Sequence, residues 1–186
     1  MSTARPDVRL TYDDFLLFPE DGKRHEIIDG EHYVTPSPNR RHQQLLGRLF
    51  LAFAEHLRDH PALGEVYFAP FDVVFSNWDV VEPDLIFVAG NQRSILTDKN
   101  IVGAPALVVE ILSPGTRKRD QQLKRRLFDR SGVQEYWMVD PDKDVVVVHR
   151  RDADGGFPRL DELGAGEMVT TPLMPAFSLL LSTLFS

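Results

Sequence analysis

The chain has no cysteine among its 186 residues. That absence excludes disulfide bonds, thiolate zinc sites and cysteine nucleophiles, and it fits a protein that works in the reducing cytoplasm. No stretch approaches the ~20 consecutive apolar residues that a membrane-spanning helix needs. Residues 1–7 also lack the apolar core of a signal peptide. We therefore expect a cytoplasmic protein with no membrane partner.

Familiar catalytic signatures are missing as well. There is no glycine-rich phosphate loop of the Walker type, which disfavours nucleotide hydrolysis. We find no zinc-type cluster among the histidines, which disfavours a zinc hydrolase. What remains is a composition of 42% hydrophobic and 26% charged residues, which is typical of a globular protein.

Positive charge is scarce overall but concentrated locally. The formal net charge of −7 argues against nonspecific affinity for nucleic acid. The segment Arg117–Arg126 nevertheless holds six cations and one acid. It is either a basic helix that tracks phosphates or an ordinary solvated helix face. On the first reading, the candidate phosphate-binding residues are Arg117, Lys118, Arg119, Arg125 and Arg126.

Hydrophobic periodicity and turn signals predict an α/β or α+β sandwich. We expect one domain over residues 1–186, with a core at about 40–141, an N-terminal hairpin at 24–35 and C-terminal strands and a tail at 144–186. A capping box at Thr11 begins a short helix to about Phe18, and Asp29-Gly30 favours a type I′ hairpin. The expected long helices are 40–60 and 116–131, and the other expected strands are 65–68, 71–75, 83–88, 105–113, 134–139 and 145–150.

Two acids stand inside apolar strands. Glu110 interrupts the run 105–113, and Asp84 opens the run 83–88. An ionised carboxylate in such a strand is costly to bury unless a cation meets it. If the two strands are neighbours in register, both acids could converge on one cation, and oxygen ligands suit Mg²⁺ or Mn²⁺. Alternatively, Asp84 is a strand-end turn residue and Glu110 is an ion-pair partner.

Lys124 is the expected cationic partner of these acids. It lies beside the apolar stripe formed by Leu123, Leu127 and Phe128 on the helix that follows the Glu110 strand. Its stem could pack against the core while its ammonium reaches the acids. The alternative is that Lys124 extends to solvent.

The same residues carry a resemblance to a known family. The chain resembles the Uma-two family of restriction-endonuclease-like proteins, within the PD-(D/E)XK nuclease superfamily. The matching stretches, which cover nearly the whole chain in order, are Thr11–Leu16, Glu26–Glu31, Pro83–Val88, Val109–Pro114, Asp120 with Lys124, and Gly132–Pro141. The chain departs from the superfamily pattern at Leu112, where a lysine is expected, and Lys124 is the position that replaces it.

The resemblance implies a restriction-endonuclease-like core, with a mixed β-sheet flanked by helices. It also implies a Mg²⁺- or Mn²⁺-dependent endonuclease that cuts DNA. Asp84, Glu110 and Lys124 would be the catalytic residues, and the backbone carbonyl of Ile111 would join Asp84 and Glu110 as a metal ligand. His42 resembles an accessory histidine, although an exposed helix-cap position is the simpler reading. The family hairpin contributes Glu26 and Glu31, for which hairpin or rim chemistry is favoured over support of the metal ligands.

The sequence leaves open whether the protein is catalytically active and whether it forms a dimer. A catalytically inactive module that binds nucleic acid or assembles with protein is the alternative to a nuclease. By analogy to the superfamily, cutting both strands of a duplex favours a homodimer. Val145–Val148 could form an edge that pairs with a second subunit, or equally a buried strand.

Overall fold

The computed structural model describes residues 8–186, except the side chains of residues 159 and 160. The expectation about residues 1–7 therefore lies outside the described part of the chain. None of the helices among residues 8–186 is both long and apolar enough to cross a bilayer. The helices are α1 (Tyr12–Phe15), α2 (Arg40–Asp59), α3 (Arg117–Arg119), α4 (Arg125–Ser131) and α5 (Leu181–Phe185), with a 3₁₀ helix at Gly90–Ile95 and a π-helical turn at Asp120–Lys124.

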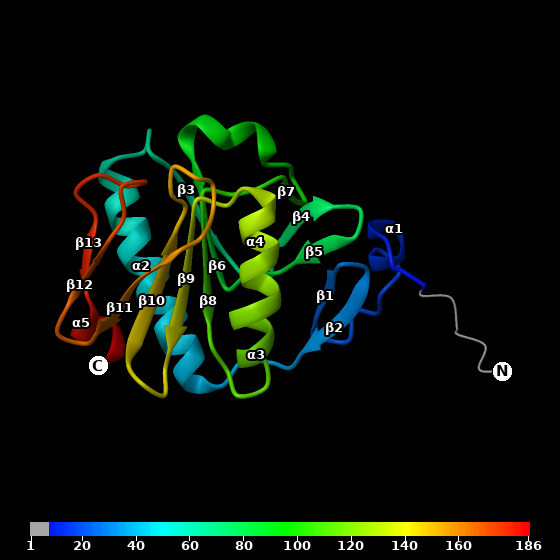
Figure 1. The fold of residues 1–186 in the computed structure, drawn as a ribbon, viewed down its shortest axis with the longest axis horizontal. Coiled ribbons are helices and arrows are strands. Elements are labelled where there is room, and N and C mark those ends of the chain that lie inside the picture. Colours follow the sequence, from blue (N-terminus) through cyan, green and yellow to red (C-terminus); the bar gives the residue numbers. More distant parts are fainter. Residues whose placement is uncertain (1–7) are drawn as a thin grey trace.

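A mixed six-stranded sheet lies between helices, which confirms the predicted fold class (Figure 1). Its strands, in spatial order, are β11 (Arg159–Gly164), β10 (Val145–Arg150), β9 (Glu135–Asp140), β8 (Leu107–Ile111), β6 (Leu85–Ala89) and β3 (Gly64–Phe68). Only β8 and β9 run parallel in this sheet; the π-turn, α3 and α4 form the crossover between them. The other neighbouring pairs are antiparallel.

The predicted N-terminal hairpin is part of a second sheet. This five-stranded sheet has the order β2 (Glu31–Thr35), β1 (Arg24–Ile28), β5 (Asp79–Val81), β4 (Asp72–Ser76) and β7 (Asn100–Val102). Asp29 and Gly30 have φ values of 55° and 81°, and a type I′ turn requires positive φ at both positions. The short strands β5 and β7 were not predicted, because three residues give too little pattern to detect.

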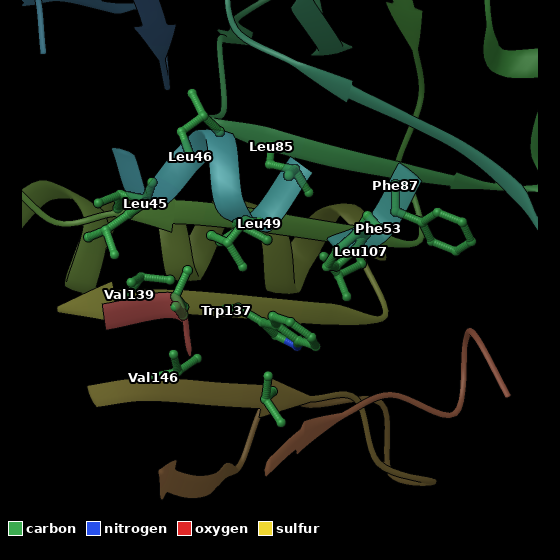
Figure 2. Packing of buried hydrophobic residues seen from close by; sticks show 14 of the residues in the cluster. Leu45, Leu46, Leu49, Phe53, Leu85, Phe87, Leu107, Trp137, Val139 and Val146 are labelled. Carbon is green, nitrogen blue, oxygen red and sulfur yellow. The ribbon is translucent and has the colours of Figure 1, made fainter. Parts of the chain in front are cut away.

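The main core lies between α2 and the six-stranded sheet (Figure 2). Leu45, Leu49 and Phe53 recur at helical spacing, so they project from one face of α2 onto β6, β8 and β9. The ring of Phe53 meets Trp137 edge-to-face, with centroids 5.7 Å apart. The C-terminal tail closes this core, since Leu181 of α5 is buried in the same cluster, as expected for a tail that packs on the core.

A second core fills the opposite face of the six-stranded sheet. It joins Val108 and Leu112 to Leu127 and Phe128 of α4 and to residues of the five-stranded sheet such as Val81. The alternation along β8 is therefore as predicted, because Leu107, Val109 and Ile111 belong to the α2 side. Glu110 consequently points to the α4 side of the sheet.

Two local predictions need correction. Strand β10 pairs with β9 on one side and with β11 on the other, so Val145–Val148 is not a free edge for a second subunit. Strand β11 was missed because its charged sequence lacks a strand's apolar alternation. The helix expected at 116–131 is present but contains the π-turn, and it ends at Gly132, whose φ of 88° is the left-handed geometry that favours glycine.

The α2 core makes a direct prediction about stability. Phe53→Ala should lower the free energy of unfolding by about 3–5 kcal/mol, because it removes a buried ring and leaves a cavity. Leu51→Ala, on the exposed side of the same helix, is the matched control and should change stability by less than about 0.5 kcal/mol. Urea unfolding followed by circular dichroism measures both. Equal effects of the two variants would contradict the assignment of the α2 face.

Candidate active site

The two strand acids lie next to each other on paired strands, and Glu110 is also an ion-pair partner, of Lys124. Strands β6 and β8 are antiparallel neighbours, and the pairing of Leu85 with Val109 places Asp84 beside Glu110 in the ladder. Asp84, Glu110, Asp120 and Lys124 all line one pocket of about 320 Å³. Each of these four residues is almost fully buried, with at most 3% of its surface exposed. The pocket therefore concentrates four ionisable groups where water is largely excluded.

Asp84 is held by three donors from separate parts of the fold. Its Oδ2 accepts hydrogen bonds from the backbone N–H of Ile111 at 2.8 Å and from Nε2 of His42 at 3.0 Å. Its Oδ1 accepts from the guanidinium of Arg24 at 2.7 Å. Burial raises the pKa of Asp84, but the His42 hydrogen bond and the Arg24 charge outweigh burial and bring it to about 2. Asp84 is therefore ionised at neutral pH.

Lys124 joins two acids from opposite sides of the site. Its ammonium lies 2.7 Å from Oε1 of Glu110 and 2.7 Å from Oε1 of Glu26. Burial lowers the pKa of Lys124, but Glu110 and Glu26 outweigh this and raise it above its usual range. Burial raises the pKa of Glu110 well above its usual value despite the lysine, and the charge of Asp84 adds to that rise. Added positive charge in the pocket would therefore stabilise the ionised form of Glu110.

The π-turn places Asp120 in the same pocket. Oδ1 of Asp120 lies 3.9 Å from the Lys124 ammonium. It is buried without a hydrogen-bond partner in the part of the chain that the structure describes. Burial raises the pKa of Asp120, which Lys124 only partly offsets. π-turns inside α-helices often occur at functional sites, and this one carries both Asp120 and Lys124.

Of the accessory candidates, His42 and Glu26 lie in the site and Glu31 does not. The exposed-cap reading of His42 is wrong, because His42 is buried and bonded to Asp84, while its backbone N–H is capped by Asn39. The rim reading of Glu26 is also wrong, because Glu26 is 1% exposed and contacts Lys124. Glu31 is exposed and accepts a hydrogen bond from the Tyr33 hydroxyl, as hairpin chemistry predicts.

The basic segment does not present all its cations to solvent. Arg117 bonds to Asp140 and Asp142, and the guanidinium of Arg125 donates to a backbone carbonyl at 2.7 Å. Arg119 lines the pocket and lies 3.4 Å from Oε2 of Glu26. Lys118 and Arg126 are exposed.

Sequence reasoning missed Arg24 and Asp120. Arg24 comes from β1, a strand of the other sheet, so no local pattern connects it with Asp84. Asp120 did carry a signal, since it precedes Lys124 by four residues on a helix and stands in the family motif. The histidine reading also needs correction, because His56 of α2 and His60, which directly follows α2, stand four residues apart with stacked rings.

The donor set of the pocket fits a hard divalent cation. Mg²⁺ and Mn²⁺ prefer carboxylate and carbonyl oxygens, and Asp84 and Glu110 offer carboxylates on adjacent strands. Oxygen atoms of Glu26 and Asp120 are buried without hydrogen-bond partners among residues 8–186. No group of three or more histidines and acids in that range is already arranged around a metal position. Lys124 and Arg24 supply the positive charge that the acids contact in this structure.

Comparisons with known proteins bear on the family and the fold. A model of the Uma2 family, described as "Putative restriction endonuclease", matches residues 12–182. The uncharacterised protein slr1290 of Synechocystis sp. is 24% identical over 159 residues, which are 83% of this chain and 80% of that protein. The crystal structure of a "putative nuclease belonging to DUF820" from Anabaena variabilis has a TM-score of 0.77 at 21% identity, covering 95% of this chain and 97% of that one. The last similarity shows a shared fold.

Removing Lys124 should destabilise the protein in a pH-dependent way. Lys124→Met leaves Glu110 buried without a cation and Glu26 with Arg119 alone, which should lower the free energy of unfolding by about 3–5 kcal/mol at neutral pH. Buried carboxyls without a cation have a folded-state pKa above the unfolded value of about 4.3, so they stabilise the fold at low pH and lose that contribution as pH rises.

The loss caused by Lys124→Met should therefore be smaller at about pH 5 than at about pH 8. Urea unfolding at both pH values measures it, with the exposed Lys118→Met on the same helix as the control. A loss that does not depend on pH would contradict the pairing of Lys124 with buried carboxylates.

Proposed function

This chain belongs to the Uma2 family, and from that membership and the geometry of the pocket we propose that it is a divalent-metal-dependent endonuclease that hydrolyses DNA phosphodiester bonds. The observation that carries the proposal is the meeting of Asp84, Glu110 and Lys124 in one buried pocket, from two paired strands and the helix that follows. Mg²⁺ is the proposed ion, with Mn²⁺ as a substitute.

Asp84, Glu110 and the backbone carbonyl of Ile111 would hold the metal. When bound, the ion would polarise a phosphate oxygen and lower the pKa of bound water. The Ile111 N–H, His42 and Arg24 keep the Asp84 carboxylate ionised and oriented. The Lys124 ammonium, already positioned by Glu110 and Glu26, would orient the attacking water or offset the negative charge that develops on phosphorus.

Substrate phosphates flanking the scissile bond would bind cations around the pocket. We propose Arg119 at the pocket wall and the exposed Lys118 and Arg126 for this role. Arg117 and Arg125 would bind phosphate only after releasing their present hydrogen-bond partners. Single-domain organisation over residues 1–186, a cytoplasmic location and a homodimer remain part of the same proposal.

A catalytically inactive binding or assembly module is the alternative, and two observations favour it. Leu112 occupies the position of the usual superfamily lysine, and the acids are already neutralised by Lys124 and Arg24. Titration calorimetry with Mn²⁺ separates the two functions. Retained DNA binding without any metal binding would favour the inactive module.

The endonuclease predicts a specific pattern of activity loss. Asp84→Ala and Glu110→Ala should each reduce Mg²⁺-dependent cleavage of plasmid and linear DNA by at least about 100-fold, because each removes a ligand oxygen. Lys124→Ala should have a similar effect. Glu31→Ala, an exposed hairpin carboxylate, is the control and should keep full activity. Undiminished cleavage by all three site variants would overturn the assignment.

The cationic contacts predict a salt dependence. Lys118→Ala and Arg126→Ala should each weaken DNA binding similarly across sequences and reduce the slope of log affinity against log salt by about 1. Lys99→Ala, an exposed lysine outside the basic segment, is the control. Fluorescence anisotropy over a range of salt concentrations measures the slopes. Unchanged slopes would place the phosphate contacts elsewhere.

A further inference from the structure

A second pocket opens beside the acidic one. It has a volume of about 320 Å³ and shares Arg24, His42 and Asp84 with the active-site pocket. We call it the side pocket. That volume lies at the lower end of the about 300–1,000 Å³ typical of small-ligand pockets. Because the two pockets share Asp84, a nucleotide whose phosphate lies at Asp84 and Glu110 has the side pocket next to it.

The walls of the side pocket are largely apolar. Leu46 of α2 and two pairs of residues from loops, Pro36 with Pro38 and Ala69 with Pro70, line it. Flat rings bind well between such surfaces, because apolar walls exclude water from both faces of a ring. These apolar surfaces therefore suit an aromatic ring, while Lys23 and Arg24 add positive charge to the same pocket.

Polar side chains also line the side pocket, among them Lys23, Gln43 and Glu82. Glu82 is 8% exposed, and its Oε2 atom is buried without a hydrogen-bond partner among the described residues. No hydrogen bond to its Oε1 atom is present in that part of the chain either. Buried polar atoms are nearly always paired, so an unpaired acceptor in a pocket indicates a missing donor.

The backbone around Glu82 is fixed from the hairpin side. Its N–H donates to Oε1 of Glu26 at 3.2 Å, and its carbonyl accepts from the guanidinium of Arg24 at 3.3 Å. Both hairpin residues also contact catalytic candidates: Glu26 contacts Lys124, and Arg24 contacts Asp84. The backbone of Glu82 is therefore held at a set position relative to the acidic pocket.

We propose that the side pocket binds an unstacked base of the DNA strand being cut, and that the Glu82 carboxylate selects a base with an exocyclic amino group, guanine above all. Guanine presents two neighbouring N–H donors, N1–H and the 2-amino group, to the two oxygens of one carboxylate. Thymine has no amino group to donate. A base inside a duplex cannot enter such a pocket, so the substrate is single-stranded or has the base flipped out. This inference rests on the proposed nuclease function.

Binding of short single-stranded oligonucleotides tests the inference. Five-nucleotide thymidine strands that carry one central dG, dA, dC or deoxyinosine are compared with all-thymidine by fluorescence anisotropy, with Ca²⁺ in place of Mg²⁺. The dG strand should bind at least about tenfold more tightly than all-thymidine, the order expected of a bidentate contact to a base. Deoxyinosine, which lacks the 2-amino group, should bind more weakly than dG.

The protein variant Glu82→Gln should lose the preference for dG. Asp72→Asn is the matched control, since Asp72 is another partly buried carboxylate whose charge acts on Glu82 but which does not line the side pocket, and it should keep the preference. The deoxyinosine comparison needs only the wild-type chain, so it decides the matter even if Glu82→Gln fails to fold. Equal affinity for all five strands, no binding of any strand, or an unchanged preference in Glu82→Gln would overturn the inference.

Cleavage of a mixed-sequence single strand in Mg²⁺ is mapped in parallel. Cleavage without any base preference would leave the nuclease standing and overturn the side-pocket inference. A dG preference in binding without cleavage would support the side pocket while contradicting hydrolysis.

Discussion

The Lys124 ammonium, buried between Glu110 and Glu26, is the interaction on which the site depends. It connects three elements that are far apart in sequence: β1, β8 and the π-turn before α4. Burying several carboxylates together is tolerated only because cations meet them, and Lys124 and Arg24 do so here. The same arrangement explains why the acids lie at one end of the paired strands β6 and β8 rather than in either core.

The N-terminal hairpin is therefore part of the candidate active site. Its strand β1 sends Arg24 to Asp84 and Glu26 to Lys124, and it contacts the backbone of Glu82 through both residues. In Figure 1 the hairpin lies beside α3 and α4, on the side away from the C-terminal strands. The Uma2 family model matches residues 12–182, so the matched region contains this hairpin as well as the central sheet.

The sequence predicted most of this because strong local patterns coincide with the site. The apolar strand around Glu110 and the apolar stripe beside Lys124 indicated which faces meet. The register of β6 with β8 was only a condition of that prediction, and it is the structure that supplies it. His42 and Glu26 were misjudged because their burial depends on contacts with distant strands, which no local pattern reveals. Arg24 and Glu82 were missed for the same reason, whereas Asp120 had a local signal, its position four residues before Lys124. Short or charged strands such as β7 and β11 gave no periodic signal.

The central claim is that Asp84 and Glu110 together hold a divalent cation beside Lys124. Anomalous diffraction at the manganese edge, from crystals of this chain soaked in Mn²⁺, tests it most directly. The account predicts a single strong peak between the carboxylates of Asp84 and Glu110, with the Lys124 ammonium still in contact with Glu26. A fully soaked crystal without a peak in this pocket, or with manganese bound only elsewhere, would contradict it.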